Sequence, residues 1–311
     1  MLAGCRTAVP AVSWQSSVGR EHPLVGKIWD VAAGRFVDET TLVRRIAQAR
    51  YALLGEKHDN PDHHTLQARL LRALTAGGRR PAVAFEMLTP AQAAPLARHL
   101  AARPRDAAGI GAAVAWGASG WPEWSMYEPI AEAALAAGLP IVVANLDTER
   151  VRAASRQGVR ALDAALVQRH GLDTTLPESV RLSMVEEIRD AHCGHALDNV
   201  VDAMLVVQRA RDAQMADALA TAPGTGGAVL IAGAGHVRND RGVPAYLRRI
   251  APTARITSIA FLEVDPKRTD PESYGARFGD RLPFDYVWFT PAVDDEDPCE
   301  KFRKSLERLR R

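Results

Sequence analysis

The sequence has little of what marks the specialised classes of protein. Of its 311 residues only 3 are cysteine and 6% are aromatic, and 39 basic residues nearly balance 37 acidic ones. The net charge of +2 is spread along the chain, so we expect no nucleic-acid partner. No apolar run approaches the roughly 20 residues that a helix needs to cross a bilayer.

Two common catalytic motifs are also missing. The chain contains neither a Gly-x-Ser-x-Gly nucleophile turn nor a His-Glu-x-x-His helix. Serine hydrolases of the usual kind and zinc proteases of the His-Glu-x-x-His class are therefore excluded.

Short apolar segments alternate with helical segments along most of the chain. Strands are predicted at 27–31, 35–37, 51–55, 81–88, 140–146, 228–236, 255–264 and 284–290. Several of them are apolar throughout, as are strands that helices cover on both faces. The pattern predicts an α/β fold with a mainly parallel central sheet and helices on both faces, in one domain over residues 24–311.

The first residues form a separate segment. Leu2-Ala3-Gly4-Cys5 resembles the lipobox of bacterial lipoproteins, although only Met1 precedes it. The following residues are rich in Ser, Pro, Ala and Gly, as tethers are, so we assign 1–23 to a lipobox and flexible tether. A lipid on Cys5 would hold the domain at a membrane of the bacterial cell envelope.

The other two cysteines form an even pair if Cys5 carries lipid. An exported protein permits Cys193 and Cys299 to form a disulfide. In the chain-entropy model a loop of about 105 residues is then closed, which stabilises by on the order of 4 kcal/mol. Two unpaired thiols are the alternative, and we favour the disulfide.

Polar residues gather where the predicted strands end. After the strand at 51–55, a turn holds Glu56, His58, Asp59, Asp62, His63 and His64. A structural turn would need one helix cap, such as Asp62, and one Gly. Glu86, Asn145 and His236 lie at or near the carboxyl ends of three other predicted strands. Because parallel strands end at one edge of a sheet, we expect these groups and the pair Glu56 and His58 to share one rim.

Several ordered motifs carry a family resemblance. They are LLGEKHDNPDHH (53–64), FEM (85–87), HCG (192–194), QRARDAQMA (208–216), GAGHVRNDRGVP (233–244) and the tail elements WFTP (288–291) and DPC (297–299). Together they resemble the ChaN-like haem-binding uptake proteins of the Tiki superfamily. The resemblance implies haem binding for iron uptake, frequent lipidation, and haem at a contact between two subunits, hence a homodimer.

The same resemblance implies a second, enzymatic function. Related Tiki-type proteases and erythromycin esterase-like enzymes are similar at Glu56, His58, Glu86 and His236, and in the protease branch these groups bind a divalent metal ion. The metal would lower the pKa of a bound water.

Without metal, His beside Glu could act as a general base, with Arg211 or Arg238 stabilising the oxyanion. Asp212 belongs to the same candidate site, although Arg211 and Asp212 are equally well explained as a buried pair that fixes packing.

For haem, the sequence offers several ligands. Iron needs an axial His or Tyr, propionates need basic groups, and the macrocycle needs an apolar wall. Tyr127 beside Trp124 is the first axial candidate, His63 and His64 come next, and Arg238 is the basic candidate. No Cys-x-x-Cys-His attachment motif exists, so the haem would be held non-covalently and exchange freely.

Two further histidines lie in the family motif around residue 193. His192 and His195 stand three residues apart and could ligate a metal, yet a helix cap or a surface role is the favoured interpretation.

The sequence therefore predicts a lipid-anchored envelope protein that binds haem. A metal-dependent hydrolase is the alternative, and a scaffold with a vestigial Glu/His cluster is the third.

Overall fold

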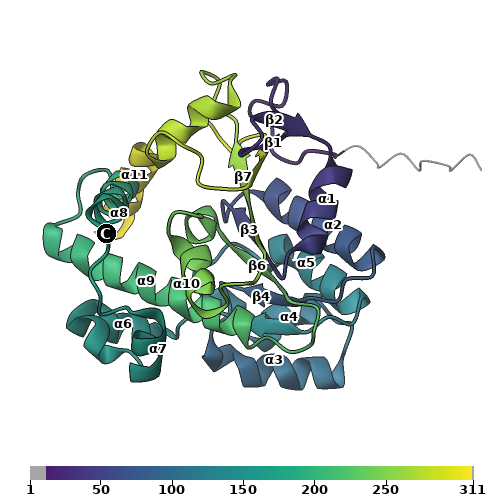
Figure 1. The fold of residues 1–311 in the computed structure, drawn as a ribbon, viewed down its shortest axis with the longest axis horizontal. Coiled ribbons are helices and arrows are strands. Elements are labelled where there is room, and N and C mark those ends of the chain that lie inside the picture. The colour runs from purple at the N-terminus through teal and green to yellow at the C-terminus, as the bar shows by residue number, and fades with distance from the viewer. Residues whose placement is uncertain (1–11, 310–311) are drawn as a thin grey trace, which may run out of the picture.

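An eight-stranded sheet runs through the middle of the molecule (Figure 1). The computed structural model describes residues 12–309. The strand order across the sheet is β2-β1-β8-β7-β3-β6-β4-β5. In chain order the strands are β1 (Ile28–Asp30), β2 (Arg35–Val37), β3 (Tyr51–Glu56), β4 (Ala82–Phe85), β5 (Ile141–Val143), β6 (Ala228–Gly233), β7 (Ile256–Glu263) and β8 (Tyr286–Thr290).

Most of the sheet is parallel, as the alternation of strands and helices predicts. β8, β7, β3, β6, β4 and β5 pair in parallel, whereas the hairpin of β1 and β2 adds an antiparallel edge next to β8. The central strands β3, β4 and β6 are buried along their whole length. This burial explains their uninterrupted apolar sequence.

Helices connect the parallel strands. The α-helices are α1 (Glu39–Gln48), α2 (Pro61–Ala76), α3 (Pro90–Ala102), α4 (Ala108–Ala113), α5 (Trp124–Ala136), α6 (Thr148–Gln157), α7 (Ala164–His170), α8 (Glu178–Ala191), α9 (Asp198–Ala220), α10 (Gly242–Ile250) and α11 (Pro298–Leu309). Short 3₁₀ helices are η1 (Trp116–Ala118), η2 (Gly158–Ala161), η3 (Ala234–Val237) and η4 (Pro271–Phe278). Within the described residues, no helix is long and apolar enough to span a membrane.

The helices cover both faces of the sheet, which confirms the predicted fold class. Alternate residues of a strand point to opposite faces. Thus Leu54 packs in a core with α1, α2 and α5, whereas Leu53 packs on the other face with α9 and α10. Smaller apolar clusters join α6 and α7 to α9, and α8 to the start of α9. Figure 1 shows α9 running outward from the sheet toward α8.

Residues 12–23 do not behave as a tether. The backbone N–H groups of Gln15 and Ser16 donate to the Asp62 carboxylate at 2.7 and 2.9 Å, and Val18 pairs with Ala292. The predicted boundary at residue 23 therefore lies too late, because buried Asp62 binds this stretch to the body. The lipobox, with Cys5, falls outside the described residues.

The start of α2 also differs from the expected cap. Asn60, not Asp62, caps the helix, because its side-chain oxygen accepts from the N–H of Asp62 at 2.9 Å. Pro61 then takes the first helical position, where its missing N–H has no consequence. The carboxylate of Asp62 is thereby left to bind the N-terminal segment.

Candidate functional site

Three neighbouring strands bring the candidate acids to one edge of the sheet. In the parallel register, Glu56 of β3 lies opposite Gly233 at the end of β6. Glu86 follows directly after β4, and His236 lies in η3, directly after β6. His58 belongs to the turn after β3. These four residues therefore meet at the carboxyl ends of the strands, where ligand crevices of open α/β sheets are found.

Acids and imidazoles alternate in a continuous chain. His58 Nδ1 lies 2.9 Å from Glu56 Oε1, and His58 Nε2 lies 4.0 Å from Glu86 Oε2. His236 Nε2 lies 3.2 Å from Glu86 Oε1, and its Nδ1 lies 2.6 Å from Asp212 Oδ1. We call Glu56, His58, Glu86, His236 and Asp212 the acid–imidazole relay. The four residues predicted to share the rim do share it, and Asp212 of α9 extends the series.

Glu56 has more partners than any other member. Its Oε1 also accepts from the Tyr127 hydroxyl at 2.9 Å, and its Oε2 accepts from the Gln67 side chain at 2.7 Å. His64 Nδ1 lies 3.2 Å from the same Oε2. Both carboxylate oxygens are thus occupied inside the core. Asn145, also expected at the rim, follows the parallel strand β5, and its side-chain oxygen accepts the N–H of Leu146 at 2.8 Å.

The relay is strongly charged although it is buried. Burial by itself would raise the pKa of Glu86, but His236 and His58 hold this pKa at about 2. Burial by itself would lower the pKa of His236, but Glu86 and Asp212 raise it to about 10. In the same way His64 and His58 outweigh burial and keep the pKa of Glu56 well below its usual range. His236 is therefore an imidazolium clamped between two carboxylates at neutral pH.

This pairing does not fit the predicted metal site. Among residues 12–309, no group of three or more His, Cys, Asp or Glu side chains is arranged to hold a metal ion. The physical reason lies in the relay: both ring nitrogens of His236 face carboxylates, so neither offers a lone pair. The metal set Glu56, His58, Glu86 and His236 is thus an ion-pair network in this structure.

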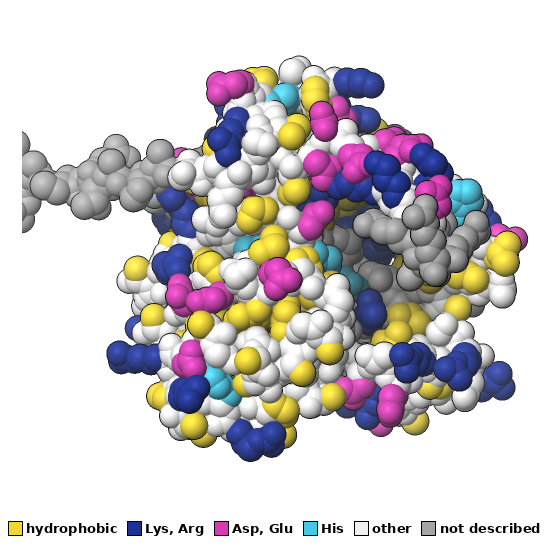
Figure 2. Space-filling model, turned by 180° about the vertical axis from the view of Figure 1, so that it is seen from behind, with side chains coloured by type: hydrophobic (Ala, Val, Ile, Leu, Met, Phe, Trp, Pro, Cys, Tyr) yellow, Lys and Arg dark blue, Asp and Glu magenta, His cyan; other side chains and the backbone are white. Residues whose placement is uncertain are grey.

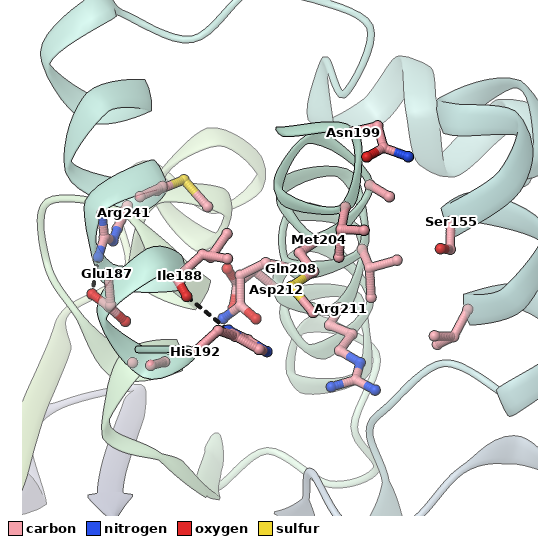
Figure 3. A pocket seen from close by; sticks show the side chains of 17 residues that line it. Ser155, Glu187, Ile188, His192, Asn199, Met204, Gln208, Arg211, Asp212 and Arg241 are labelled. Carbon is pink, nitrogen blue, oxygen red and sulfur yellow. Dashed lines mark hydrogen bonds and ion pairs between the residues drawn. The ribbon is translucent and has the colours of Figure 1, made fainter. Parts of the chain in front are cut away.

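A cleft lies at the Asp212 end of the relay. It has a volume of about 650 Å³ and is bounded by α6, α8 and α9 (Figure 3). The space-filling view is hollowed on the side where these helices lie (Figure 2). Its apolar lining includes Val151, Met184, Ile188, Val200, Met204 and Val207. Its polar lining includes Ser155, Glu187, His192, Asn199, Gln208, Arg211, Asp212 and Arg241.

Comparison with protein families identifies the fold and its relatives. The family model described as haem-binding uptake, Tiki superfamily, ChaN matches residues 42–247, which is well over half of the chain. The chain belongs to this family. No curated protein sequence matches it significantly.

Solved structures agree on the fold. A structure described as cofacial haem binding to ChaN of Campylobacter jejuni matches with a TM-score of 0.65 at 20% identity, over 84% of this chain and 95% of that one. The type III effector HopBA1 matches with a TM-score of 0.44 at 13% identity, over 81% of this chain and 92% of that one. The first likeness establishes a ChaN-type fold, and the second is too distant to support an argument.

The side chains predicted to hold haem lie in the core. Tyr127 and His63 are fully buried, and His64 and Trp124 are 1% and 8% exposed. Trp124 packs on Trp116 and donates its indole N–H to a backbone carbonyl. In this structure the four side chains serve core packing, and their role in haem binding stays a prediction.

The polar atoms of His63 and Tyr127 also have hydrogen-bond partners inside the protein. Both ring nitrogens of His63 bond inside the protein, to the N–H of Lys57 and to the Thr290 hydroxyl, each at 2.9 Å. Burial and then Glu56 raise the pKa of Tyr127 far above its usual value, so this phenol keeps its proton in the chain without ligand.

The two arginines have different environments. Arg238 is 1% exposed and forms ion pairs with Asp240 at 2.6 Å and Glu187 at 2.8 Å, so its charge is neutralised away from the relay. A contact between Arg238 and a ligand stays a prediction, and it would have to displace one of these ion pairs. Arg211 lines the cleft, and its buried Nε has no hydrogen-bond partner among the described residues. Arg211 does not pair with Asp212, which binds His236 instead.

Cys193 and Cys299 are joined by a disulfide, with their Cα atoms 5.5 Å apart. The bond ties the C-terminal helix α11 to the turn that follows α8. His192, at the end of α8, immediately precedes this bond and lines the cleft. The sequence favours a cap or surface role for His192, and the structure places this residue at the C-cap of α8. The family motif HCG is the sequence feature that points to this part of the cleft.

The donor set of the cleft fits haem. It combines an imidazole, an incompletely satisfied guanidinium and walls of aliphatic and methionine side chains. Bound haem would supply an iron that takes an axial nitrogen or sulfur ligand and two propionates that take basic partners. The residues expected from the sequence do not form this set.

Proposed function

We propose that this protein binds haem non-covalently in the cleft between α6, α8 and α9, as an envelope lipoprotein of haem and iron uptake. The observation that carries the proposal is the cleft itself, in a chain that belongs to a haem-binding uptake family. Its volume of about 650 Å³ lies within the range of ligand pockets, about 300–1,000 Å³.

The shape of the lining supports a flat apolar ligand. Met184 and Ile188 of α8 line the cleft together with Met204 and Val207 of α9. Methionine side chains are flexible and polarisable, and they pack well against aromatic systems. A macrocycle in the cleft would replace water with dispersion contacts to these side chains.

The charges in the cleft support a ligand with acidic groups. Arg211 brings a guanidinium whose Nε lacks a partner among the described residues, and an unpaired buried donor is costly. Arg241 also lines the cleft, but Glu187 already pairs with it. Arg211 is therefore the residue to which we assign a haem propionate.

We further propose a homodimer at the cleft. The ChaN structure of C. jejuni is described as binding haem cofacially, which requires two haem groups stacked on one another. In this chain Leu182, Leu197 and Val200 are 51%, 69% and 38% exposed, and they lie on α8 and at the start of α9. Val200 also lines the cleft. A second copy would cover these side chains together with the open side of a bound haem.

Haem titration of the purified full chain tests binding. We expect a shifted Soret band that saturates with micromolar haem at one haem per chain, and a change from monomer to dimer in size-exclusion chromatography. A matched variant, Arg211→Gln, keeps the length of the side chain and removes its charge. It is expected to weaken haem binding roughly tenfold, in line with the loss of one charge-assisted hydrogen bond of about 1.5 kcal/mol. An unchanged haem spectrum of the wild-type chain at micromolar haem would refute the proposal.

Localisation rests on Cys5 and needs its own experiment. We propose that the chain, expressed behind a lipoprotein signal peptide in a bacterium, partitions into the membrane fraction through lipid on Cys5. Cys5→Ser is expected to move it to the soluble fraction, whereas Cys193→Ser with Cys299→Ser serves as the control that removes the other two cysteines, which are joined by the disulfide. Equal membrane association of wild-type chain and Cys5→Ser would contradict the anchor.

A hydrolase is the second candidate, and one observation favours it. The side chain of His58 is 32% exposed while its Nδ1 contacts buried Glu56, which is the geometry of an oriented general base. Hydrolysis of a p-nitrophenyl ester by the metal-free chain tests this function. His58→Gln should abolish the activity; activity that persists in His58→Gln, or no activity in the wild-type chain, removes the candidate.

A further inference from the structure

We propose that Met204, through its thioether sulfur, is an axial ligand of the haem iron. The inference rests on the proposed haem-binding function and deepens it by naming the atom that binds the metal. Met204 lies on α9 and lines the cleft (Figure 3). Its side chain is partly exposed, so a ligand that enters the cleft can reach it.

The residues of α9 that line the cleft form one stripe along the helix. They recur at spacings of three and four residues, which places their side chains on one face of an α-helix. They are Asn199, Val200, Ala203, Met204, Val207, Gln208, Arg211 and Asp212. Met204 lies in the middle of this stripe. Arg211, the residue to which we assign a haem propionate, lies toward its end.

The position of Met204 relative to Arg211 suits a ligand that binds both. The two residues are seven positions apart, since 211 minus 204 is 7, which is about two turns and roughly 10.5 Å along the helix axis. A haem group carries its propionates at one edge of the macrocycle, away from the central iron. One side chain of α9 can therefore bind the iron while the other, on the same face, pairs with a propionate.

A thioether is chemically suited to this apolar lining. It carries no charge and has no proton to lose, so burial does not oppose its ligating form. A phenol must first lose its proton, and burial and then Glu56 raise the pKa of Tyr127 far above its usual value. Haem iron takes methionine sulfur as an axial ligand, and this ligand favours the ferrous state by raising the reduction potential.

The other donors of the cleft are engaged by protein groups. The Met184 side chain is 5% exposed and belongs to the apolar cluster that joins α8 to α9. His192 Nδ1 lies 2.7 Å from the carbonyl oxygen of Ile188, and this residue takes part in further interactions. The carboxylate of Asp212 lies 2.6 Å from the His236 ring. Ligation by Met204 leaves all of these contacts in place.

X-ray absorption at the iron edge tests the assignment, because it detects an iron–sulfur bond directly. The full chain is loaded with haem and reduced with dithionite. Every sample carries Cys5→Ser, so that this thiol adds no signal, and the other two cysteines are joined by the disulfide. We call this sample the parent chain. We expect it to show iron–sulfur scattering at about 2.3 Å, a typical metal–sulfur distance.

Two methionine substitutions form a matched pair. Met204→Leu and Met184→Leu each nearly keep the volume of a cleft-lining side chain and remove its sulfur. We expect Met204→Leu to lose the iron–sulfur signal and to bind ferrous haem at least roughly tenfold more weakly, since even a residue that only orients a metal ligand costs about 10–100-fold when it is lost. Met184→Leu should behave as the parent chain.

Folding of the variants is checked separately. Circular dichroism identifies any loss of fold in either leucine variant. Met204→Gln, which is also unbranched and free of sulfur, takes the place of Met204→Leu if that variant does not fold, and it should lose the iron–sulfur signal in the same way.

The outcomes separate the inference from the proposed function. Haem binding without iron–sulfur scattering in the parent chain would overturn the assignment and leave the haem function intact. A signal that persists in folded Met204→Leu, or one that is lost in folded Met184→Leu, would also overturn it. A parent chain that binds no haem would remove the proposed function itself.

Discussion

Glu86 gives the sharpest test of the acid–imidazole relay. Glu86→Gln keeps the shape of the side chain and removes its charge, so the His236 imidazolium keeps Asp212 as its one close carboxylate. Burial would lower the pKa of His236, but the two acids outweigh it and raise this pKa from 6.5 to about 10, a net effect of roughly 5 kcal/mol at about 1.4 kcal/mol per unit. Losing one acid should therefore lower the free energy of unfolding by about 2–4 kcal/mol at pH 7, near the cost of breaking a buried ion pair.

The assay is unfolding of the disulfide-intact chain in guanidinium chloride. Wild type and variant are fitted with one common slope for the dependence of the unfolding free energy on denaturant concentration. Glu39→Gln is the matched control, because Glu39 pairs with Arg69 near the surface at 2.7 Å and such pairs contribute about 1 kcal/mol or less. If Glu86→Gln costs no more than Glu39→Gln, the relay is not the buried charge network described above, and the reasoning fails.

Three further predictions address pH, the disulfide and the packing of β3. The pKa of His236 is raised from 6.5 to about 10 and that of Glu86 is lowered from 4.5 to about 2, so their stabilisation is complete between about pH 4.5 and 6.5. It should fall as pH rises toward 10 and as pH falls toward 2, which thermal unfolding across pH measures; a stability independent of pH would contradict it. Cys193→Ser with Cys299→Ser opens a bond across 106 positions and should cost up to about 5 kcal/mol in denaturant unfolding, whereas an unchanged midpoint would show that the link adds nothing. Gly55→Ala would place a Cβ 2.3 Å from a valine methyl group and should destabilise by about 1–3 kcal/mol; unaltered thermal stability would refute this contact.

The rim of the sheet was predictable from sequence because one rule of topology suffices. Parallel strands end at the same edge, so polar residues that follow apolar strands are brought together without knowledge of side-chain packing. Glu56, Glu86 and His236 meet for this reason. The bond from Asp212 to His236 depends on how α9 rotates against the sheet, which the spacing of residues within α9 does not determine.

The haem ligands were not predictable in the same way. Tyr127 and Trp124 occupy helical positions that suit either a cofactor wall or a hydrophobic core, and the structure uses them for the core. The cleft instead depends on the tertiary arrangement of α6, α8 and α9, which the residue pattern of each helix does not determine. His192 reaches that cleft because α8 ends there, a boundary that residue patterns locate poorly.

The helix cap illustrates a smaller ambiguity. Both Asn60 and Asp62 are good capping residues, and they stand two positions apart. The choice of Asn60 follows from Pro61, which favours the first helical position, and it frees Asp62 to hold Gln15 and Ser16. This long-range contact, and with it the true start of the folded body, has no local signal.

An iron-edge anomalous difference map of crystals grown with haem tests the central claim most directly. The account predicts an iron peak inside the cleft bounded by α6, α8 and α9. An iron peak beside Tyr127 or at the surface away from α8 and α9 would contradict it.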